Sequence, residues 1–144
     1  MILDGAQEHP SVNSNVSIIP KTKFSMYVPE VESKLKENTN LAHILLCGIE
    51  THVCVYQTAT DLIEKGYNVH IVVDCVSSQR EADRAVGIAK LQSIGCQLTT
   101  VEMALFELLG DAKHENFKEV SNVVKSRNLS IGQLSLSGEP KPSL

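Results

Sequence analysis

The chain has 144 residues, a length that suits one domain with a core of its own. Thirteen Lys and Arg against 17 Asp and Glu give a formal net charge of −4 with no basic stripe, so we expect no nucleic-acid partner. The apolar runs are only strand-sized, and the N-terminus lacks the basic start and apolar core of a secretory signal. We therefore expect no membrane association and a cytoplasmic location, with mitochondria, nucleus and peroxisome left open.

Regular elements are predicted in alternation along the chain. Residues 16–19 predict a short strand, and residues 29–37 predict a helix with proline at its first position. Residues 43–49 form a continuous apolar run, which is typical of a strand buried on both faces. Residues 51–65 carry apolar side chains at helical spacing, and Gly66 ends this helix.

The second half of the chain repeats this order. A strand is predicted at residues 69–73, a helix at 80–93 with a capping box of Ser78 and Glu81, and a shorter strand at 97–100. Helices are predicted at 102–109 and 114–126, and Asp74 is expected to cap the loop after its strand.

This order predicts an α/β protein, with a parallel sheet covered by helices on both faces in three α/β/α layers. We divide the chain into an atypical segment at residues 1–15, a domain at 16–126 and a disordered tail at 127–144.

The four cysteines match neither a zinc framework nor a disulfide scaffold. Cys47, Cys75 and Cys96 are interpreted as small buried side chains. Cys54 differs, because it follows a strand end and lies about three residues into a helix for which Thr51 is the expected N-cap. Backbone N–H groups and the helix dipole favour an anion there, so the thiol is expected to have a lowered pKa. Spacing alone leaves open that Cys54 is merely a buried helix residue facing the sheet.

A longer pattern surrounds this cysteine. Residues 48–61 read Gly-Ile-Glu-Thr-x-x-Cys-Val-x-x-Thr-Ala-x-Asp, followed by Gly66-Tyr67 and Val72-Val73-Asp74. Together with Pro20-Lys21-Thr22-Lys23-Phe24-Ser25-Met26 and the Gly110-Asp111-Ala112 segment, the pattern resembles the isochorismatase-like cysteine hydrolases. This superfamily includes nicotinamidases and N-carbamoylsarcosine amidases. The resemblance is greatest to the isochorismatase domain-containing proteins, and it runs from about residue 20 to residue 125.

The resemblance implies roles for individual residues. Cys54 takes the place of the nucleophile, and Lys21 that of the catalytic lysine, with Lys23 as a less suitable candidate that we interpret as a solvated charge. A cis peptide near Ile49–Glu50 would turn the backbone N–H groups of Glu50 and Cys54 into an oxyanion hole. The family fold is a parallel sheet of about six strands.

Three histidines are weighed separately. His52 could have a catalytic role, because Cys-His pairs are common. However, it precedes Cys54 by two residues on a helix, so its side chain would point to a different face. A place on the surface or the pocket rim is therefore favoured. His43 and His70 lie in predicted strands and are interpreted as packed residues.

The family's third catalytic residue, an aspartate in an apolar-Asp-x-Gln strand, has no counterpart. Asp4 is the nearest candidate, but only 16 residues separate it from Lys21, whereas a crossover between parallel strands needs about 30 residues. We therefore reject Asp4 and expect an N-terminally truncated chain that lacks the first strands, with no metal and no cofactor.

Two functions remain open. The first is a hydrolase with a cysteine nucleophile that acts on a small amide or an isochorismate-like substrate. The second is a catalytically inactive, truncated module that acts through protein–protein association. A homo-oligomer is expected in either case.

Overall fold

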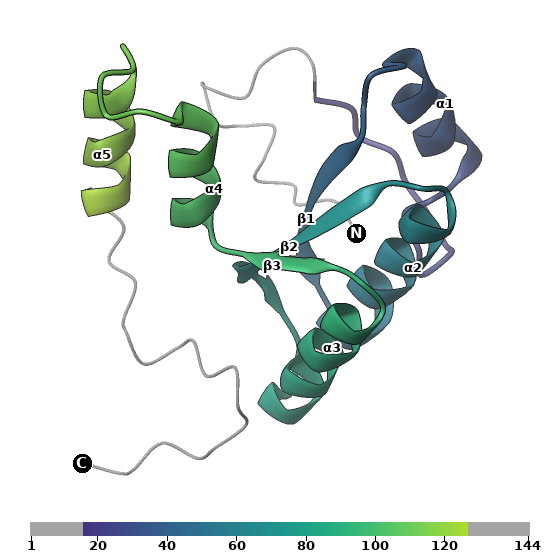
Figure 1. The fold of residues 1–144 in the computed structure, drawn as a ribbon. Helices are drawn as coiled ribbons and strands as arrows, with labels where there is room; N and C mark the ends of the chain where they lie inside the picture. Colours follow the sequence, from purple (N-terminus) through teal and green to yellow (C-terminus); the bar gives the residue numbers. More distant parts are fainter. Residues whose placement is uncertain (1–15, 127–144) are drawn as a thin grey trace, which may run out of the picture.

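The computed structural model describes residues 16–126, and the structural statements below concern this part of the chain. Its elements, drawn in Figure 1, are α1 (Pro29–Glu37), β1 (His43–Ile49), the π-helix η2 (Thr51–Val55), α2 (Tyr56–Glu64), β2 (Asn68–Ser77), α3 (Glu81–Ser93), β3 (Gln97–Thr99), α4 (Val101–Leu109) and α5 (Phe117–Ser126). From residue 29 on, the predicted elements are confirmed in kind and order. The predicted strand at residues 16–19 is wrong, since residues 16–20 have no regular structure.

The sheet is parallel, with its described strands in the order β1-β2-β3. Helices α2 and α3 pack on one face, where Val69, Ile71 and Val73 of β2 contact the apolar side of both helices in one buried cluster. Helix α4 lies on the opposite face, and Figure 1 shows α4 and α5 on the other side of the sheet from α2 and α3. The predicted three-layer α/β/α arrangement is confirmed.

Strand β1 is not buried on both faces, contrary to the prediction from its apolar sequence. Its residues alternate between exposed and half-buried, and Leu45 is 52% exposed. The reason is its position: among the described strands β1 has a neighbour on one side only, and no described helix covers its outer face. An apolar run therefore indicated a strand correctly but could not indicate how many neighbours that strand has.

The pairing between β1 and β2 shifts near the C-terminal end of both strands. Leu46 pairs with Ile71, but Gly48 pairs with Val76, so β2 carries an extra stretch that β1 does not match. The buried side chain of Arg84 compensates, because it donates hydrogen bonds to the carbonyl oxygens of Val73 and Val76. Strand β2 thereby extends to Ser77, beside the start of η2.

The predicted capping box at the start of α3 does not form. Arg80 is the N-cap residue and makes no side-chain capping bond, while the Ser78 hydroxyl instead contacts η2. Asp74 is a capping residue as expected, but of a different element: its carboxylate accepts a hydrogen bond from the backbone N–H of Val101 at 3.0 Å, where α4 begins.

The cysteines other than Cys54 divide into two groups. Cys96 is buried as predicted, and burial raises the pKa of its thiol to about 11. Cys47 and Cys75 are exposed, so their predicted burial is wrong. Cys47 belongs to β1, whose outer side is uncovered. His43 and His70 lie on that same side: His43 is exposed, and its Nδ1 atom lies 2.9 Å from Nε2 of the half-buried His70.

In residues 16–126, none of the helices has the length and apolarity needed to cross a membrane.

Candidate active site

The chain turns sharply between β1 and the helix that carries Cys54. Glu50 adopts a left-handed backbone conformation with φ of 56°, which is uncommon for a residue with a side chain. The peptide bonds of residues 16–126 are all trans, so the cis peptide expected near Ile49–Glu50 is not found there. The left-handed residue makes the turn instead, and the Glu50 carbonyl oxygen then accepts bonds from both Val53 and Val55.

The first turn after Glu50 is a π-helix anchored by Thr51. Thr51 is fully buried, its hydroxyl donates to the carbonyl oxygen of Ser77, and its backbone N–H donates to the Ser78 hydroxyl at 3.1 Å. Thr51 is therefore not the predicted N-cap, since Glu50 holds that position without a side-chain bond. These hydrogen bonds to the end of β2 and to Ser78 fix the place where the helix that carries Cys54 starts.

His52 lies on the side of η2 away from the cysteine. Its Nδ1 atom is 3.1 Å from the Ser78 hydroxyl and 3.6 Å from a carboxylate oxygen of Glu50. Its backbone packs closely on Gly87 of α3, where an added methyl group would lie 3.0 Å from the His52 nitrogen. His52 does not line the pocket beside Cys54. The geometry thus supports an anchoring contact for His52.

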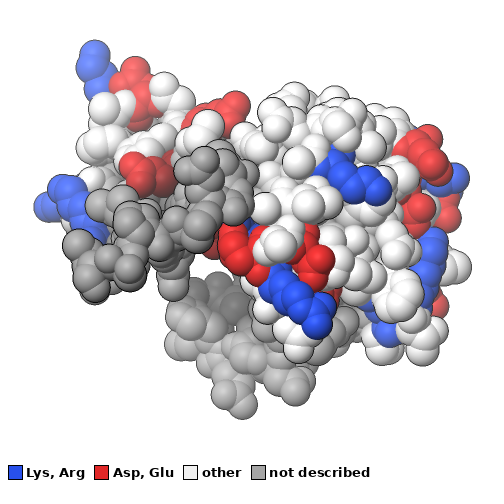
Figure 2. Space-filling view, turned by 90° about the horizontal axis from the view of Figure 1, so that it is seen from below, with Lys and Arg blue, Asp and Glu red and all other residues white. Residues whose placement is uncertain are grey.

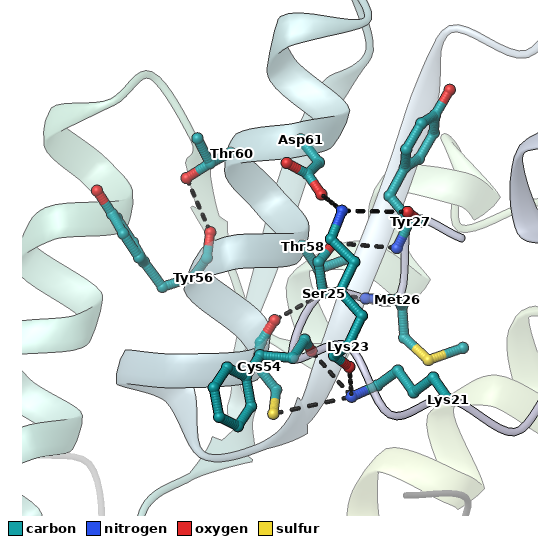
Figure 3. A network of polar contacts seen from close by, with 11 residues as sticks. Lys21, Lys23, Ser25, Met26, Tyr27, Cys54, Tyr56, Thr58, Thr60 and Asp61 are labelled. Atoms are coloured by element: carbon teal, nitrogen blue, oxygen red, sulfur yellow. Dashed lines mark hydrogen bonds and ion pairs between the residues drawn. The ribbon is translucent and has the colours of Figure 1, made fainter. Parts of the chain in front are cut away.

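Lys21 faces the cysteine sulfur. Its Nζ atom lies 3.9 Å from Sγ of Cys54 and donates hydrogen bonds to the backbone carbonyl oxygens of Lys23 and Phe24, at 3.0 and 2.8 Å. Figure 3 shows this ammonium group pointing toward the sulfur. Because the two carbonyl groups hold the ammonium in place, the positive charge stays beside the half-buried thiol.

Lys23 points the other way, toward α2. Its Nζ atom is 2.8 Å from a carboxylate oxygen of Asp61, and this hydrogen bond lowers the pKa of Asp61 below its ordinary value. The two lysines considered as candidates in the sequence therefore have different contacts in the structure. Lys21 approaches Cys54, and Lys23 forms an ion pair at the surface.

Thr58 holds the lysine segment against the cysteine helix. Its buried hydroxyl donates to the carbonyl oxygen of Cys54 at 2.6 Å and accepts from the backbone N–H of Met26 at 2.8 Å. Ser25, buried next to it, accepts a bond from the N–H of Tyr27. The sequence pattern contains Thr58 but indicates no role for it; its place one helical turn after Cys54 is the signal that could have shown this contact.

A pocket of about 370 Å³ opens in front of the sulfur. Its walls are formed by the Lys21 segment, the C-terminal half of β1 and the first turns of the cysteine helix: Lys21, Met26, Leu46, Cys47, Gly48, Ile49, Glu50, Cys54, Val55 and Thr58. Glu50 is the one carboxylate among these residues, and its carboxylate lies close to His52. Within residues 16–126, no group of three or more His, Cys, Asp or Glu side chains could hold a metal ion.

The pocket therefore combines a thiol, a fixed ammonium group and a helix start at the C-terminal end of a parallel strand. A thiol held beside a fixed positive charge suits nucleophilic attack on a carbonyl carbon. The family model described as the isochorismatase domain matches residues 4–103. The chain belongs to the isochorismatase family.

Relatives and solved structures agree with this assignment. The isochorismatase domain-containing protein 2 of Xenopus laevis is 47% identical over 120 residues, which cover 83% of this chain and 58% of the frog protein. A structure of MAR1 ribonuclease from Caenorhabditis elegans matches with a TM-score of 0.72 and 43% identity, over 81% of this chain and 59% of that one. Nicotinamidase PncA from Bacillus subtilis matches at 0.50 and 30% identity, over 54% of this chain and 43% of that one.

This isochorismatase-family chain spans about half the length of the curated relatives that it matches. The predictions for residues 1–15 and 127–144, including the rejection of Asp4 and the disordered tail, lie outside the described residues. They stay predictions, as does the truncation of the chain.

Proposed function

We propose that this chain is a cysteine hydrolase acting on a small amide or an isochorismate-like substrate, with Cys54 as the nucleophile and Lys21 as its charged partner. The observation that carries the proposal is the 3.9 Å approach of the Lys21 ammonium to the Cys54 sulfur, at the wall of a pocket of about 370 Å³. Both residues were proposed from the sequence, and the fold brings them together across 33 positions.

For an amide, the sulfur of Cys54 attacks the carbonyl carbon and the carbonyl oxygen gains negative charge. Backbone N–H groups at Glu50 and Cys54 are the proposed donors to this oxyanion, and Lys21 adds a positive charge nearby. The proton that the thiol has lost is transferred to the nitrogen, the C–N bond breaks, the amine leaves, and a thioester remains. Water then hydrolyses the thioester and returns the thiol and a carboxylic acid.

The alternative is a catalytically inactive module, and one observation favours it. The leaving amine needs a group that delivers its proton. Glu50 is the one carboxylate among the pocket residues, and its carboxylate oxygen lies 3.6 Å from Nδ1 of His52, a residue outside the pocket lining. Under this alternative Cys54 keeps its place at the helix start but turns over no substrate.

An RNA substrate is less well supported for this chain. The C. elegans structure is described as a ribonuclease. Here the net charge is −4, and on the face shown in Figure 2 basic and acidic side chains lie among one another without a continuous basic stripe. A phosphate backbone requires such positive charge, so we favour a small molecule.

The test combines labelling and turnover on the whole chain. Iodoacetamide labelling near neutral pH, read by mass spectrometry, should modify Cys54 faster than the exposed Cys47 and Cys75, and Cys96 most slowly. Ammonia release from nicotinamide, hydrolysis of isochorismate and cleavage of a single-stranded RNA are then measured for the wild type, for Cys54→Ser and for Cys75→Ser as the control.

Activity on either small molecule that is lost in Cys54→Ser and kept in Cys75→Ser supports the hydrolase. Fast labelling without turnover of any substrate supports the inactive module. If Cys54 reacts no faster than Cys47, the activated nucleophile is rejected for this form of the chain.

A further inference from the structure

Two histidines meet on the outer face of the sheet. His43 is the first residue of β1 and pairs with Asn68, and His70 lies two positions further along β2, so the two imidazole rings are diagonal neighbours. Nδ1 of His43 lies 2.9 Å from Nε2 of His70, and the ring centroids are 5.2 Å apart. His43 is exposed and His70 is half-buried, so the pair can be reached from solvent.

The distance between the two nitrogen atoms suits a metal ion as well as a hydrogen bond. As a hydrogen bond alone, the contact requires one ring to donate its N–H to the lone pair of the other. Metal–nitrogen bonds of about 2.0–2.1 Å that meet at a right angle place two imidazole nitrogens roughly 2.9 Å apart, whereas a tetrahedral angle places them roughly 3.4 Å apart. The distance between His43 and His70 is therefore that of neighbouring ligands in an octahedral or square-planar site.

The groove in front of the pair has room for an ion with bound water, since its volume is about 470 Å³. Its lining residues come from the three strands and from α4: His43, Leu45, His70, Gln97, Ala104, Glu107 and Leu108. Glu107 brings a negative charge to this groove, and the lining contains no lysine or arginine. A carboxylate beside a metal site can accept hydrogen bonds from the ligands of the metal. The charge of the groove thus favours a cation.

We propose that His43 and His70 bind one divalent transition-metal ion in this groove, of the kind that takes an octahedral or square-planar geometry, such as Ni²⁺. In residues 16–126 no group of three or more His, Cys, Asp or Glu side chains could hold a metal ion, so the described chain supplies two ligands and water completes the coordination. The proposal departs from the expectation of no metal, because the sequence alone cannot show that two strands bring these histidines together.

This metal site is separate from the pocket beside Cys54. The two share no lining residue, so the metal site does not depend on the proposed hydrolase function. A bound ion would instead link two strands, because His43 begins β1, and β2 is the one neighbour of β1 among the described strands. An ion that binds the folded chain and not the unfolded chain stabilises the fold. Metal binding should therefore raise the Tm.

Titration of the whole chain with NiCl₂ tests the proposal, since Ni²⁺ does not oxidise the free cysteines as Cu²⁺ can. Calorimetry should show one ion bound per chain, and the Tm should rise with Ni²⁺. A long-range ¹H–¹⁵N NMR spectrum reports each imidazole group. Substoichiometric Ni²⁺, which is paramagnetic, should broaden the signals of His43 and His70 before those of the other histidines of the chain.

His43→Gln and His70→Gln should each lose the bound ion and the rise in Tm, because one imidazole alone does not chelate. His114→Gln is the matched control: His114 is also exposed, and its Nδ1 atom accepts a hydrogen bond from the backbone N–H of Asn116 outside the groove. This variant should bind Ni²⁺ as the wild type does.

Three results would overturn the proposal. These are a wild type that binds no Ni²⁺, binding that survives His70→Gln, and broadening that begins at a histidine other than His43 and His70. Circular dichroism shows whether the variants fold. If either variant fails to fold, the order in which the wild-type signals broaden decides by itself.

Discussion

The Lys21 ammonium lies 3.9 Å from the Cys54 sulfur, while Lys23, two residues later, lies 2.8 Å from Asp61. The two lysines thus have different partners, although they share one short segment. Each can be replaced to ask which charge acts on the cysteine.

Lys21→Met should slow the alkylation of Cys54 near neutral pH. The Lys21 ammonium lies 3.9 Å from the sulfur and is held there by two backbone carbonyl groups, and a fixed neighbouring cation activates a cysteine nucleophile. Lys23→Met, the control, should leave the rate unchanged. The measurement is the pseudo-first-order labelling rate by mass spectrometry, with circular dichroism to confirm folding. Equal slowing in both variants would contradict a specific role for Lys21.

Thr58→Val should lower the free energy of unfolding by about 1–3 kcal/mol. The change keeps the size of the side chain but leaves the Met26 N–H without its acceptor in a buried place. It also frees the Lys21 segment, so Cys54 labelling should slow as well. Thr60→Val is the matched control on the same helix, since the Thr60 hydroxyl only donates to the Tyr56 carbonyl oxygen. Urea unfolding of both variants distinguishes them, and similar losses would refute the bridging role.

Gly87→Ala should destabilise the chain, although alanine ordinarily stabilises a helix interior by about 0.5–1 kcal/mol relative to glycine. The added methyl group would meet the backbone N and Cα atoms of His52 at 3.0 and 3.1 Å, and backbone cannot move aside as a flexible side chain can. We expect a net loss of about 1–3 kcal/mol in urea unfolding, with altered Cys54 labelling because η2 must shift. A stability equal to or above that of the wild type would show that α3 and η2 separate easily.

Asp61→Asn should remove a small pH-dependent part of the stability. The folded chain lowers the pKa of Asp61 through Lys23, so the pair stabilises the fold above the unfolded pKa of about 3.9 and loses this contribution as pH falls through the folded pKa. Because Lys23 is 55% exposed, the contribution is only about 0.5 kcal/mol. Unfolding free energies of wild type and variant should differ near pH 7 and converge as the pH falls below the lowered pKa of Asp61. A constant difference would show that Asp61 acts by packing alone.

The order of elements and the placement of Cys54 could be predicted from the sequence. Continuous apolar residues at 43–49 and 69–73 indicated strands, and Val55, Thr58, Ala59 and Leu62 showed helical spacing and are buried. These are local signals, because the period of apolar side chains follows from backbone geometry alone. The family pattern around Cys54 was likewise readable without a structure.

Contacts between distant segments decided the rest. The exposure of β1 depends on how many strands and helices neighbour it, which no local pattern encodes. The turn at Glu50, the use of Ser78 by η2 rather than by α3, and the role of Arg84 at the shifted pairing of β1 and β2 depend on which backbone groups meet in space. The sequence by itself determined that a cysteine begins a helix after a strand. Only the tertiary structure decided that Lys21, and not Lys23, lies beside it, because two side chains two positions apart in an irregular segment can point in any direction until the fold supplies their partners.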